Sequence, residues 1–264
     1  MGLLEPLTSL EVVNVGGERR KGEWAKRRKG ERLFARRLIA QSPFRLPAVA
    51  RLQNLTISLG MPSYADQAVD SIEWYNLHAE SVVERHESIR ATDANAWLRK
   101  HLPSSPARVL DVGAGSGRDA AWLSSLGHTV VAVEPSTRMA AYARQLGRCQ
   151  DIEWIDDRLP ELTKVSARKS QFDFILANAM WMHLAPSERA PAIASLLGLL
   201  ASGGRLAITF SQGTPQANWP FFECRGEDVL DIALNQGAQL VKFRKRVPVA
   251  MSPPSVQILL QQPN

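Results

Sequence analysis

The chain has 264 residues, of which 45% are apolar and 22% are charged, so it can bury a sizeable core. This composition excludes a wholly disordered or collagen-like chain. Charged residues interrupt every apolar run before the roughly 18 positions that a membrane-spanning helix needs, so no membrane segment is expected. The two cysteines, Cys149 and Cys224, are far apart, which argues against a disulfide scaffold or a thiolate metal site. Buried, reduced thiols in a cytoplasmic protein are expected instead.

The basic residues are concentrated at the N-terminus. Residues 1–60 hold 12 Lys and Arg against 5 Asp and Glu, whereas residues 61–264 hold 20 against 21. The most basic stretch, residues 19–37, has no steady hydrophobic period, and such blocks are usually disordered and solvated. We therefore predict a basic, disordered arm over residues 1–60, with Met61 as a candidate second start. A nucleic-acid-binding arm at residues 19–37 and a targeting segment are the alternatives.

Residues 61–103 are expected to form a helical lid ahead of the main domain. Apolar residues recur with helical spacing over residues 66–87. A second short helix is predicted over residues 93–101, and Pro103 is expected to end it.

From residue 104 onward, short apolar strands alternate with helices. Such alternation predicts right-handed crossovers and a parallel sheet covered on both faces. The last two strands are close enough in sequence to pair as an antiparallel hairpin. We predict an α/β fold over residues 104–264, a doubly wound and mostly parallel seven-stranded sheet with an antiparallel C-terminal hairpin and an N-terminal helical lid. The expected strands cover residues 108–112, 129–133, 152–155, 172–177, 205–210, 239–246 and 256–260, and the expected helices 119–126, 137–146, 186–200 and 227–235.

A glycine-rich turn follows the first predicted strand. After Asp111, three glycines stand at alternate positions, Gly113, Gly115 and Gly117, where open α/β sheets bind ligands. Glycine lets the backbone turn sharply and approach a ligand closely. Glu134 ends the second strand, 21 residues after Gly113, where a carboxylate can accept hydrogen bonds from both hydroxyls of an adenosine ribose.

A third acidic site ends the third strand at Asp156 and Asp157, where one carboxylate can accept a hydrogen bond from an adenine amino group. A tight turn alone would explain the glycines but not acids at successive strand ends. A dinucleotide site is a further alternative, but its glycines follow Gly-x-Gly-x-x-Gly. Asp111 would also repel a pyrophosphate, whereas it suits a cofactor with an amino-acid head and a sulfonium.

Taken together, these motifs resemble those of the class I S-adenosylmethionine-dependent methyltransferases. The resemblance covers about residues 66–264. Residues 111–117 match the family's nucleoside-binding signature, and Glu134 matches its ribose acid. Either Asp156 or Asp157 matches the acid after its third strand. The resemblance implies S-adenosylmethionine as the cofactor.

The resemblance also extends to the fourth strand and the lid. Residues 172–184 match the family's fourth-strand segment, which places Asn178 among the cofactor-binding residues. In relatives the segment ahead of the sheet lies over the cofactor, which implies that Tyr75 touches the methionine end. The alternative is that Tyr75 merely belongs to the apolar face of its helix. Arg118, at the start of the first crossover helix, is expected to be exposed, and the alternative is that it reaches a carboxylate of the substrate or cofactor.

Methyl transfer from a sulfonium is an in-line displacement, so alignment, which can contribute about 7–11 kcal/mol, is the main requirement and no metal is needed. A general base helps only where the acceptor keeps its proton at neutral pH. His183, just after the fourth strand, is the candidate base, and the alternative is a loop histidine bonded to the backbone. We therefore expect a methyltransferase acting on a small molecule. A second hypothesis is a nucleic-acid-binding or nucleic-acid-modifying protein that uses the basic arm, although Asn178 lacks the Pro-Pro-aromatic continuation of many such enzymes. A third is a catalytically silent interaction protein that retains the fold, because fold alone does not prove activity.

Overall fold

The computed structural model describes residues 70–212, 220–246 and 254–264. The arm predicted at residues 1–60 and the first part of the predicted lid lie outside these residues, so the domain boundaries stay predictions. Cys224 is buried, but Cys149 is only half-buried, unlike the expectation for both thiols. Within the residues described, no helix is long and apolar enough to cross a membrane.

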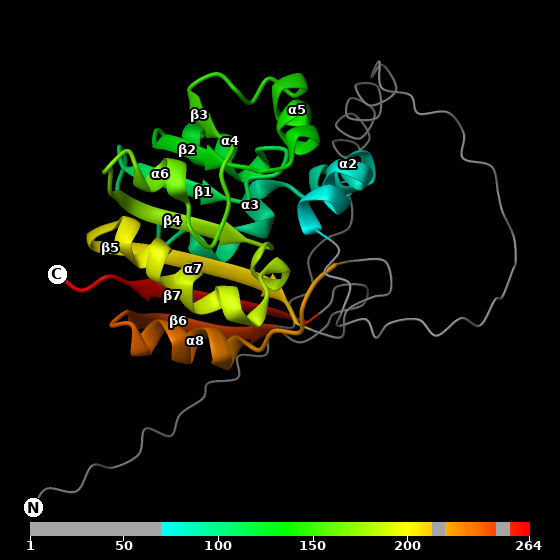
Figure 1. The fold of residues 1–264 in the computed structure, drawn as a ribbon. Coiled ribbons are helices and arrows are strands. Elements are labelled where there is room, and N and C mark those ends of the chain that lie inside the picture. The colour runs from blue at the N-terminus through cyan, green and yellow to red at the C-terminus, as the bar shows by residue number, and fades with distance from the viewer. Residues whose placement is uncertain (1–69, 213–219, 247–253) are drawn as a thin grey trace, which may run out of the picture. The chain divides into compact units, whose positions relative to one another are not determined.

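A seven-stranded sheet forms the centre of the described structure (Figure 1). Its strand order is β3-β2-β1-β4-β5-β7-β6. The first five strands are parallel, and β7 pairs antiparallel with both β5 and β6. The predicted fold class is therefore confirmed. The strands are β1 (Arg108–Val112), β2 (Thr129–Val133), β3 (Ile152–Ile155), β4 (Phe172–Asn178), β5 (Leu200–Ser211), β6 (Gln239–Arg246) and β7 (Ser255–Gln261).

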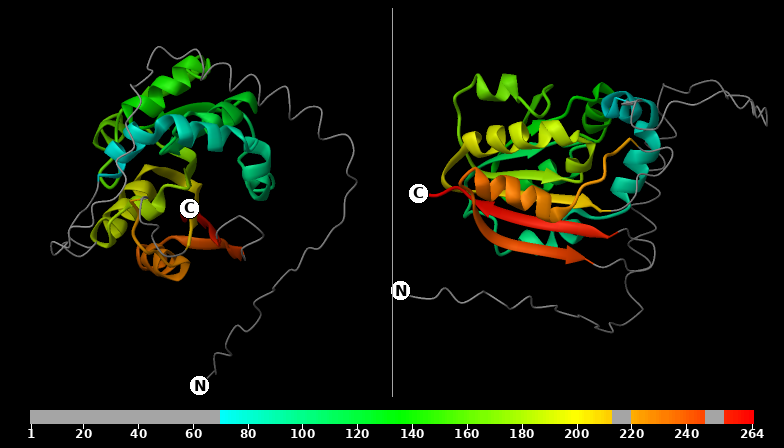
Figure 2. Two further views of the ribbon diagram at one scale, coloured as in Figure 1. Left: turned by 90° about the vertical axis from the view of Figure 1, so that its right-hand side faces the viewer. Right: turned by 60° about the horizontal axis from the view of Figure 1, so that its bottom comes forward.

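Helices cover both faces of the sheet (Figure 2). On one face, α7 and α8 pack through the larger apolar cluster, which includes Leu196 and Val229. On the other face, η1 and α4 pack through Leu98 and Leu123. The helices are α2 (Ser71–Glu87), α3 (Ala91–Ala94), η1 (Ala96–Leu98), α4 (Arg118–Ser125), α5 (Thr137–Gln145), α6 (Thr163–Ser166), η2 (Trp181–His183), α7 (Pro186–Leu199) and α8 (Gly226–Asn235).

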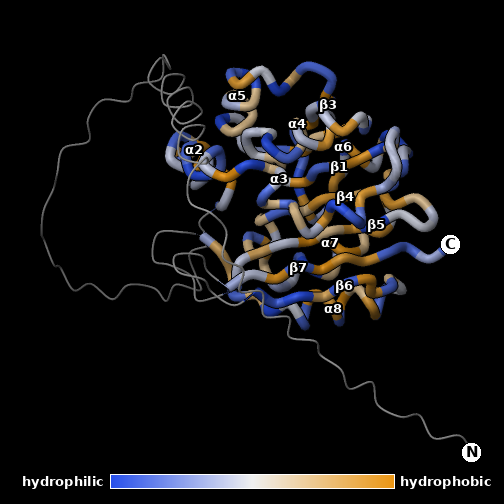
Figure 3. The backbone as a smooth tube through the Cα atoms, turned by 180° about the vertical axis from the view of Figure 1, so that it is seen from behind, coloured by the Kyte–Doolittle hydropathy of each residue, from blue (hydrophilic) through white to orange (hydrophobic). Residues whose placement is uncertain are grey.

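The position of each strand explains its sequence pattern. Central strands such as β4 are buried on both faces and read as nearly continuous apolar runs. The edge strand β6 is mostly exposed and carries several Lys and Arg side chains, which discourage pairing with another chain. Figure 3 shows this contrast as orange colouring along the central strands and more blue in β6 and α2.

The helices ahead of the sheet depart most from their prediction. The first, α2, begins at Ser71 because Asp70 caps it, its carboxylate accepting the N–H of Ile72 at 2.9 Å. The helix predicted over residues 93–101 is instead the single turn α3 followed by the short 3₁₀-helix η1, with a break at Asn95. At this break the backbone of Asn95 leaves the helical conformation, with φ −104° and ψ 18°.

The helix α2 lies beside the carboxyl ends of the parallel strands (Figure 1). Its buried face, Ala79, Val82 and Val83, packs against Met139 and Tyr142 of α5. Since open α/β sheets bind ligands at the carboxyl ends of their strands, α2 stands over the expected ligand site.

Candidate functional site

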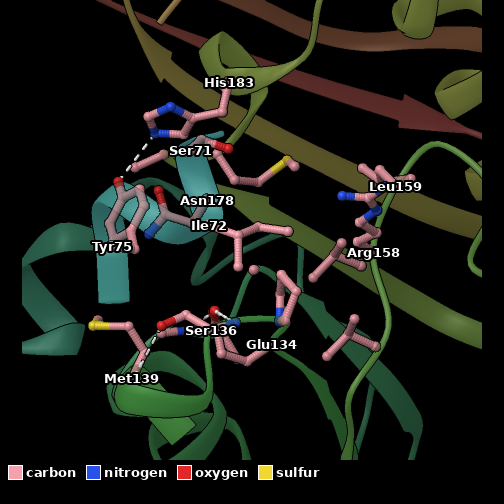
Figure 4. Close-up of a pocket in the computed structure, with 18 of the residues that line it drawn as sticks. Ser71, Ile72, Tyr75, Glu134, Ser136, Met139, Arg158, Leu159, Asn178 and His183 are labelled. Carbon is pink, nitrogen blue, oxygen red and sulfur yellow. Dashed lines mark hydrogen bonds between the residues drawn. The ribbon is translucent and has the colours of Figure 1, made fainter. Parts of the chain in front are cut away.

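A cavity of about 520 Å³ lies at the carboxyl ends of β1, β2 and β4. This volume is within the range of small-molecule sites, about 300–1,000 Å³. Its walls come from the glycine loop, the end of β2, the segments after β3 and β4, and α2 (Figure 4). The cavity brings together the following residues expected from the sequence: Tyr75, Gly113, Gly115, Glu134, Asp157, Asn178 and His183.

The three glycines of the loop all have positive φ, a region that favours glycine. A Cβ on Gly113 would stand 3.0 Å from the Cβ of Met180. A Cβ on Gly117 would stand only 2.8 Å from the ring of Trp154. Gly113 and Gly115 line the cavity, whereas Gly117 lies outside its lining, at the start of α4.

Glu134 ends β2 with its carboxylate in the cavity wall. One oxygen accepts the N–H of Gly115 at 2.7 Å, and the other accepts the N–H of Ser136 at 2.8 Å. Burial raises the pKa of Glu134 to about 7, against the effect of these two hydrogen bonds. Because each carboxylate oxygen has two lone pairs, Glu134 can also accept two hydrogen bonds from a ligand.

Asp111 lies outside the cavity lining, at the base of the glycine loop. Its side chain belongs to β1 and is only 2% exposed. Burial, and then the charge of nearby Asp119, hold the pKa of Asp111 well above its usual range. Its Oδ2 atom has no hydrogen-bond partner among the described residues. The structure thus gives Asp111 a place beneath the loop rather than in the wall that a ligand would touch.

Of the two acids after β3, only Asp157 lines the cavity. Its carboxylate accepts the backbone N–H groups of Arg158, Lys164 and Val165 at 2.7–3.0 Å, which fixes the start of α6. The side chain of Asp156 is 74% exposed and pairs with Lys164 at 3.4 Å. Of the two acids, the structure thus brings only Asp157 to the cavity.

Asn178, at the end of β4, is held on two sides. Its Nδ2 donates to Asp119 Oδ2 at 2.6 Å, and its Oδ1 accepts the hydroxyl of Thr209. Asp119 also binds Arg118, with Nε and Oδ1 2.8 Å apart. The expectation that Arg118 is exposed is wrong. Its side chain is 17% exposed, lines the cavity and donates to the carbonyl of His86 at 3.2 Å, which joins α4 to α2.

His183 is bonded to the backbone and also faces the cavity. Its Nδ1 lies 2.7 Å from the carbonyl oxygen of Pro220, and its Nε2 lies 3.0 Å from the hydroxyl of Tyr75 (Figure 4). A carbonyl oxygen can only accept, so Nδ1 holds the proton and Nε2 accepts the Tyr75 O–H. Burial lowers the pKa of His183, so the ring is neutral at neutral pH.

Further contacts of α2 have no signal in the sequence, because the partners are 29 to 61 residues apart in the chain. Glu87 forms a bidentate pair with Arg148, both distances being 2.6 Å, and also accepts the hydroxyl of Ser116 at 2.9 Å. Asn76 accepts the hydroxyl of Ser136 at 2.8 Å. These contacts fasten α2 to the glycine loop and to the segment after Glu134.

We expect Arg148→Met to lower the free energy of unfolding by about 1–3 kcal/mol, because hydrogen bonds to charged groups contribute amounts of this size. The matched control is Arg144→Met on α5. Because the Arg144 side chain is exposed, this change should alter the free energy of unfolding by no more than about 0.5 kcal/mol. Urea unfolding of the three proteins measures both values. Equal losses in the two variants would contradict the fastening role of Arg148.

The sequence of residues 110–208 matches a family described as a methyltransferase domain. A curated relative, an uncharacterized methyltransferase of Mycobacterium tuberculosis, is 28% identical over 149 residues, which cover 53% of this chain and 54% of the relative. Another, an uncharacterized methyltransferase of Staphylococcus carnosus, is 29% identical over 118 residues, which cover 42% of this chain and 50% of that protein. The chain thus spans about half the length of the curated relatives it matches.

Two solved structures share the fold. A TehB-like methyltransferase from Corynebacterium glutamicum has a TM-score of 0.53 and 23% identity, covering 70% of this chain and 98% of its own. The 1,6-didemethyltoxoflavin-N1-methyltransferase of Burkholderia thailandensis was solved with bound 1,6-didemethyltoxoflavin and S-adenosylhomocysteine. It has a TM-score of 0.55 and 21% identity, and the match covers 77% of this chain and 94% of that protein. Residues 110–208 are thus similar to a methyltransferase domain, and the fold is that of S-adenosylmethionine-dependent methyltransferases.

The described residues include no group of three or more His, Cys, Asp or Glu side chains that could hold a metal ion. The alternative of a nucleic-acid-binding arm concerns residues 19–37, which lie outside the described part of the chain. None of the relatives named above supports that alternative.

Proposed function

We propose that the protein is an enzyme that transfers the methyl group of S-adenosylmethionine to a small-molecule acceptor. The observation that carries this proposal is the carboxylate of Glu134, which lies in the cavity wall beside the glycine loop. Its remaining lone pairs suit the two neighbouring hydroxyls of a ribose, and charge-assisted hydrogen bonds of this kind are strong. The acceptor bound by the Burkholderia relative supports a small-molecule acceptor here.

The rest of the lining suits the other parts of the same cofactor. Gly113 and Gly115 line the cavity with positive φ, a conformation that glycine adopts readily and that lets the loop turn sharply beside a ligand. Asp157 lies at the rim where an adenine would bind, with apolar Leu159 beside it in the lining. We assign Gly113, Gly115, Asn178 and Tyr75 to the methionine portion, Glu134 to the ribose and Asp157 to the adenine. Asp111 and Gly117 would shape the loop without touching the cofactor, and the exposed Asp156 receives no role.

The chemistry that the bound cofactor supplies is an electrophilic methyl group on a sulfonium sulfur. The protein's own part is to align the acceptor, to exclude water beneath α2 and to accept a proton where the acceptor has one to lose. We propose that His183, held neutral with its basic Nε2 on the cavity side, accepts that proton. The free cysteines suit a cytoplasmic location, which we include in the proposal.

The test has two stages. Calorimetry with S-adenosylmethionine and S-adenosylhomocysteine is expected to show one site per chain. Incubation with a metabolite extract and methyl-labelled S-adenosylmethionine is then expected to label a small molecule, which mass spectrometry identifies. Absence of cofactor binding would contradict the proposal, and label found in RNA or DNA instead would support the nucleic-acid alternative.

A further inference from the structure

We infer that Tyr75 is the catalytic residue through which the acceptor's proton reaches His183, so that the acceptor is a molecule whose nucleophilic atom keeps its proton at neutral pH. This inference rests on the proposed methyl transfer. It adds to that proposal a second residue in the reaction and a chemical class for the acceptor.

The tautomer of His183 leaves one ring nitrogen free to accept a proton. With Nδ1 donating to the Pro220 carbonyl at 2.7 Å, the lone pair of the neutral ring is at Nε2. That lone pair already accepts the Tyr75 O–H, at 3.0 Å. The opposite tautomer would set the lone pair of Nδ1 against the carbonyl lone pairs. An acceptor's proton therefore reaches Nε2 by way of the Tyr75 hydroxyl.

The rings of Tyr75 and His183 come from different elements, α2 and η2, and have a fixed geometry (Figure 4). The rings meet edge to face, with centroids 5.2 Å apart and planes at 88°. The ring of Trp74 also packs against the ring of Tyr75, with the two centroids 5.4 Å apart. Both Tyr75 and His183 line the cavity. The pair is thus held in place by packing before any acceptor binds.

The proton and electron balance of the step is complete. A lone pair of the acceptor forms the bond to the methyl carbon, and the electron pair of the breaking carbon–sulfur bond stays on sulfur. The acceptor's proton passes to the Tyr75 oxygen while the Tyr75 proton passes to Nε2. His183 becomes an imidazolium, which takes over the positive charge lost at sulfur. The Pro220 carbonyl stabilises that cation until it releases a proton to water.

The lining of the cavity narrows the acceptor class further. It includes the apolar side chains of Ile72 and Phe222. It also carries both signs of charge, with Asp70 and Glu188 among its acids and Arg118 and Arg158 among its bases. A molecule with an apolar or aromatic body and a hydroxyl or ring N–H fits this site.

Nitrogen NMR of the full chain with ¹⁵N-labelled histidine tests the tautomer of His183 and its hydrogen bond to Tyr75. For wild-type His183 we expect a protonated Nδ1 and a hydrogen-bonded, unprotonated Nε2. Tyr75→Phe should move the Nε2 signal toward that of a free ring nitrogen. Tyr142→Phe, a buried tyrosine on α5 outside the cavity lining, should leave it unchanged. A neutral wild-type ring protonated at Nε2, or no change in Tyr75→Phe, would overturn the inference.

The kinetic half uses the acceptor labelled from the extract. Tyr75→Phe should lower kcat by about 10²-fold, the size of general acid–base effects. The affinity for S-adenosylhomocysteine should change less than about threefold, because phenylalanine keeps the ring that is assigned to the methionine portion and loses only the hydroxyl that donates to His183. The loss should shrink as the pH passes the acceptor's own pKa, because an ionised acceptor needs no proton relay. A loss that is the same at every pH, or no loss, would overturn the inference. Wild type that binds no cofactor and labels no molecule would refute the proposed function itself.

Discussion

Glu134→Gln is expected to weaken S-adenosylmethionine binding at least tenfold. Hydrogen bonds to a charged group contribute about 1.5–3 kcal/mol each, and tenfold corresponds to about 1.4 kcal/mol. Glutamine has one acceptor oxygen, so its NH₂ group would also face one of the two backbone N–H groups, of Gly115 or Ser136, that the carboxylate accepts. Calorimetry at pH 8 measures the effect. The control is Glu161→Gln, at an exposed position outside the cavity lining. Equal affinity for S-adenosylmethionine in wild type and both variants would show that Glu134 does not bind the cofactor.

The same residue makes binding depend on pH. The ribose hydroxyls need the carboxylate form, and burial raises the pKa of Glu134 to about 7. Wild-type affinity should therefore rise as the pH increases through about 7, and Glu134→Gln should lack this rise. The stability of the protein without cofactor should instead fall as the pH rises. A folded-state pKa above the usual value stabilises the fold at low pH, and that contribution is lost as the pH rises through about 7.

The sheet could be predicted from the sequence because its pattern is local. Inner strands such as β1 and β2 are buried on both faces, so apolar residues dominate both: three of the five residues in β1 and four in a row in β2. Glycine with positive φ ends the crossover helices, as at Gly127 and Gly147. Because parallel strands end at the same edge, locating Glu134 and Asp157 at strand ends was enough to bring them to one cavity.

What the sequence could not show depends on contacts between distant segments. The strand β5 begins earlier than its apolar run, since Gly203 donates to the carbonyl of Gln262 at the far end of the chain. Arg118 is buried because it contacts the end of α2, where it donates to the carbonyl of His86. The residues next to Arg118 in the sequence do not predict this contact. Asp111 has the sequence position of a ligand-binding acid, yet only the packing of α4 above it shows that it lies beneath the loop.

His183→Asn is expected to lower turnover by roughly 10²–10⁴-fold while leaving S-adenosylmethionine affinity nearly unchanged. Asparagine can place an N–H near the Pro220 carbonyl where Nδ1 now donates, but it has no basic nitrogen in place of Nε2. His78→Gln, an exposed histidine of α2, is the matched control and should keep full activity.

The pH profile separates a base from a packed side chain. The wild-type rate should rise with pH as His183 loses its proton, through an apparent pKa below the ordinary histidine value of about 6.5, because burial lowers the pKa of the ring. His183→Asn should lose this step in the profile. A small loss of rate together with a lower melting temperature and an unchanged pH profile would mean that His183 only packs the β4–α7 segment, and that alignment alone drives methyl transfer.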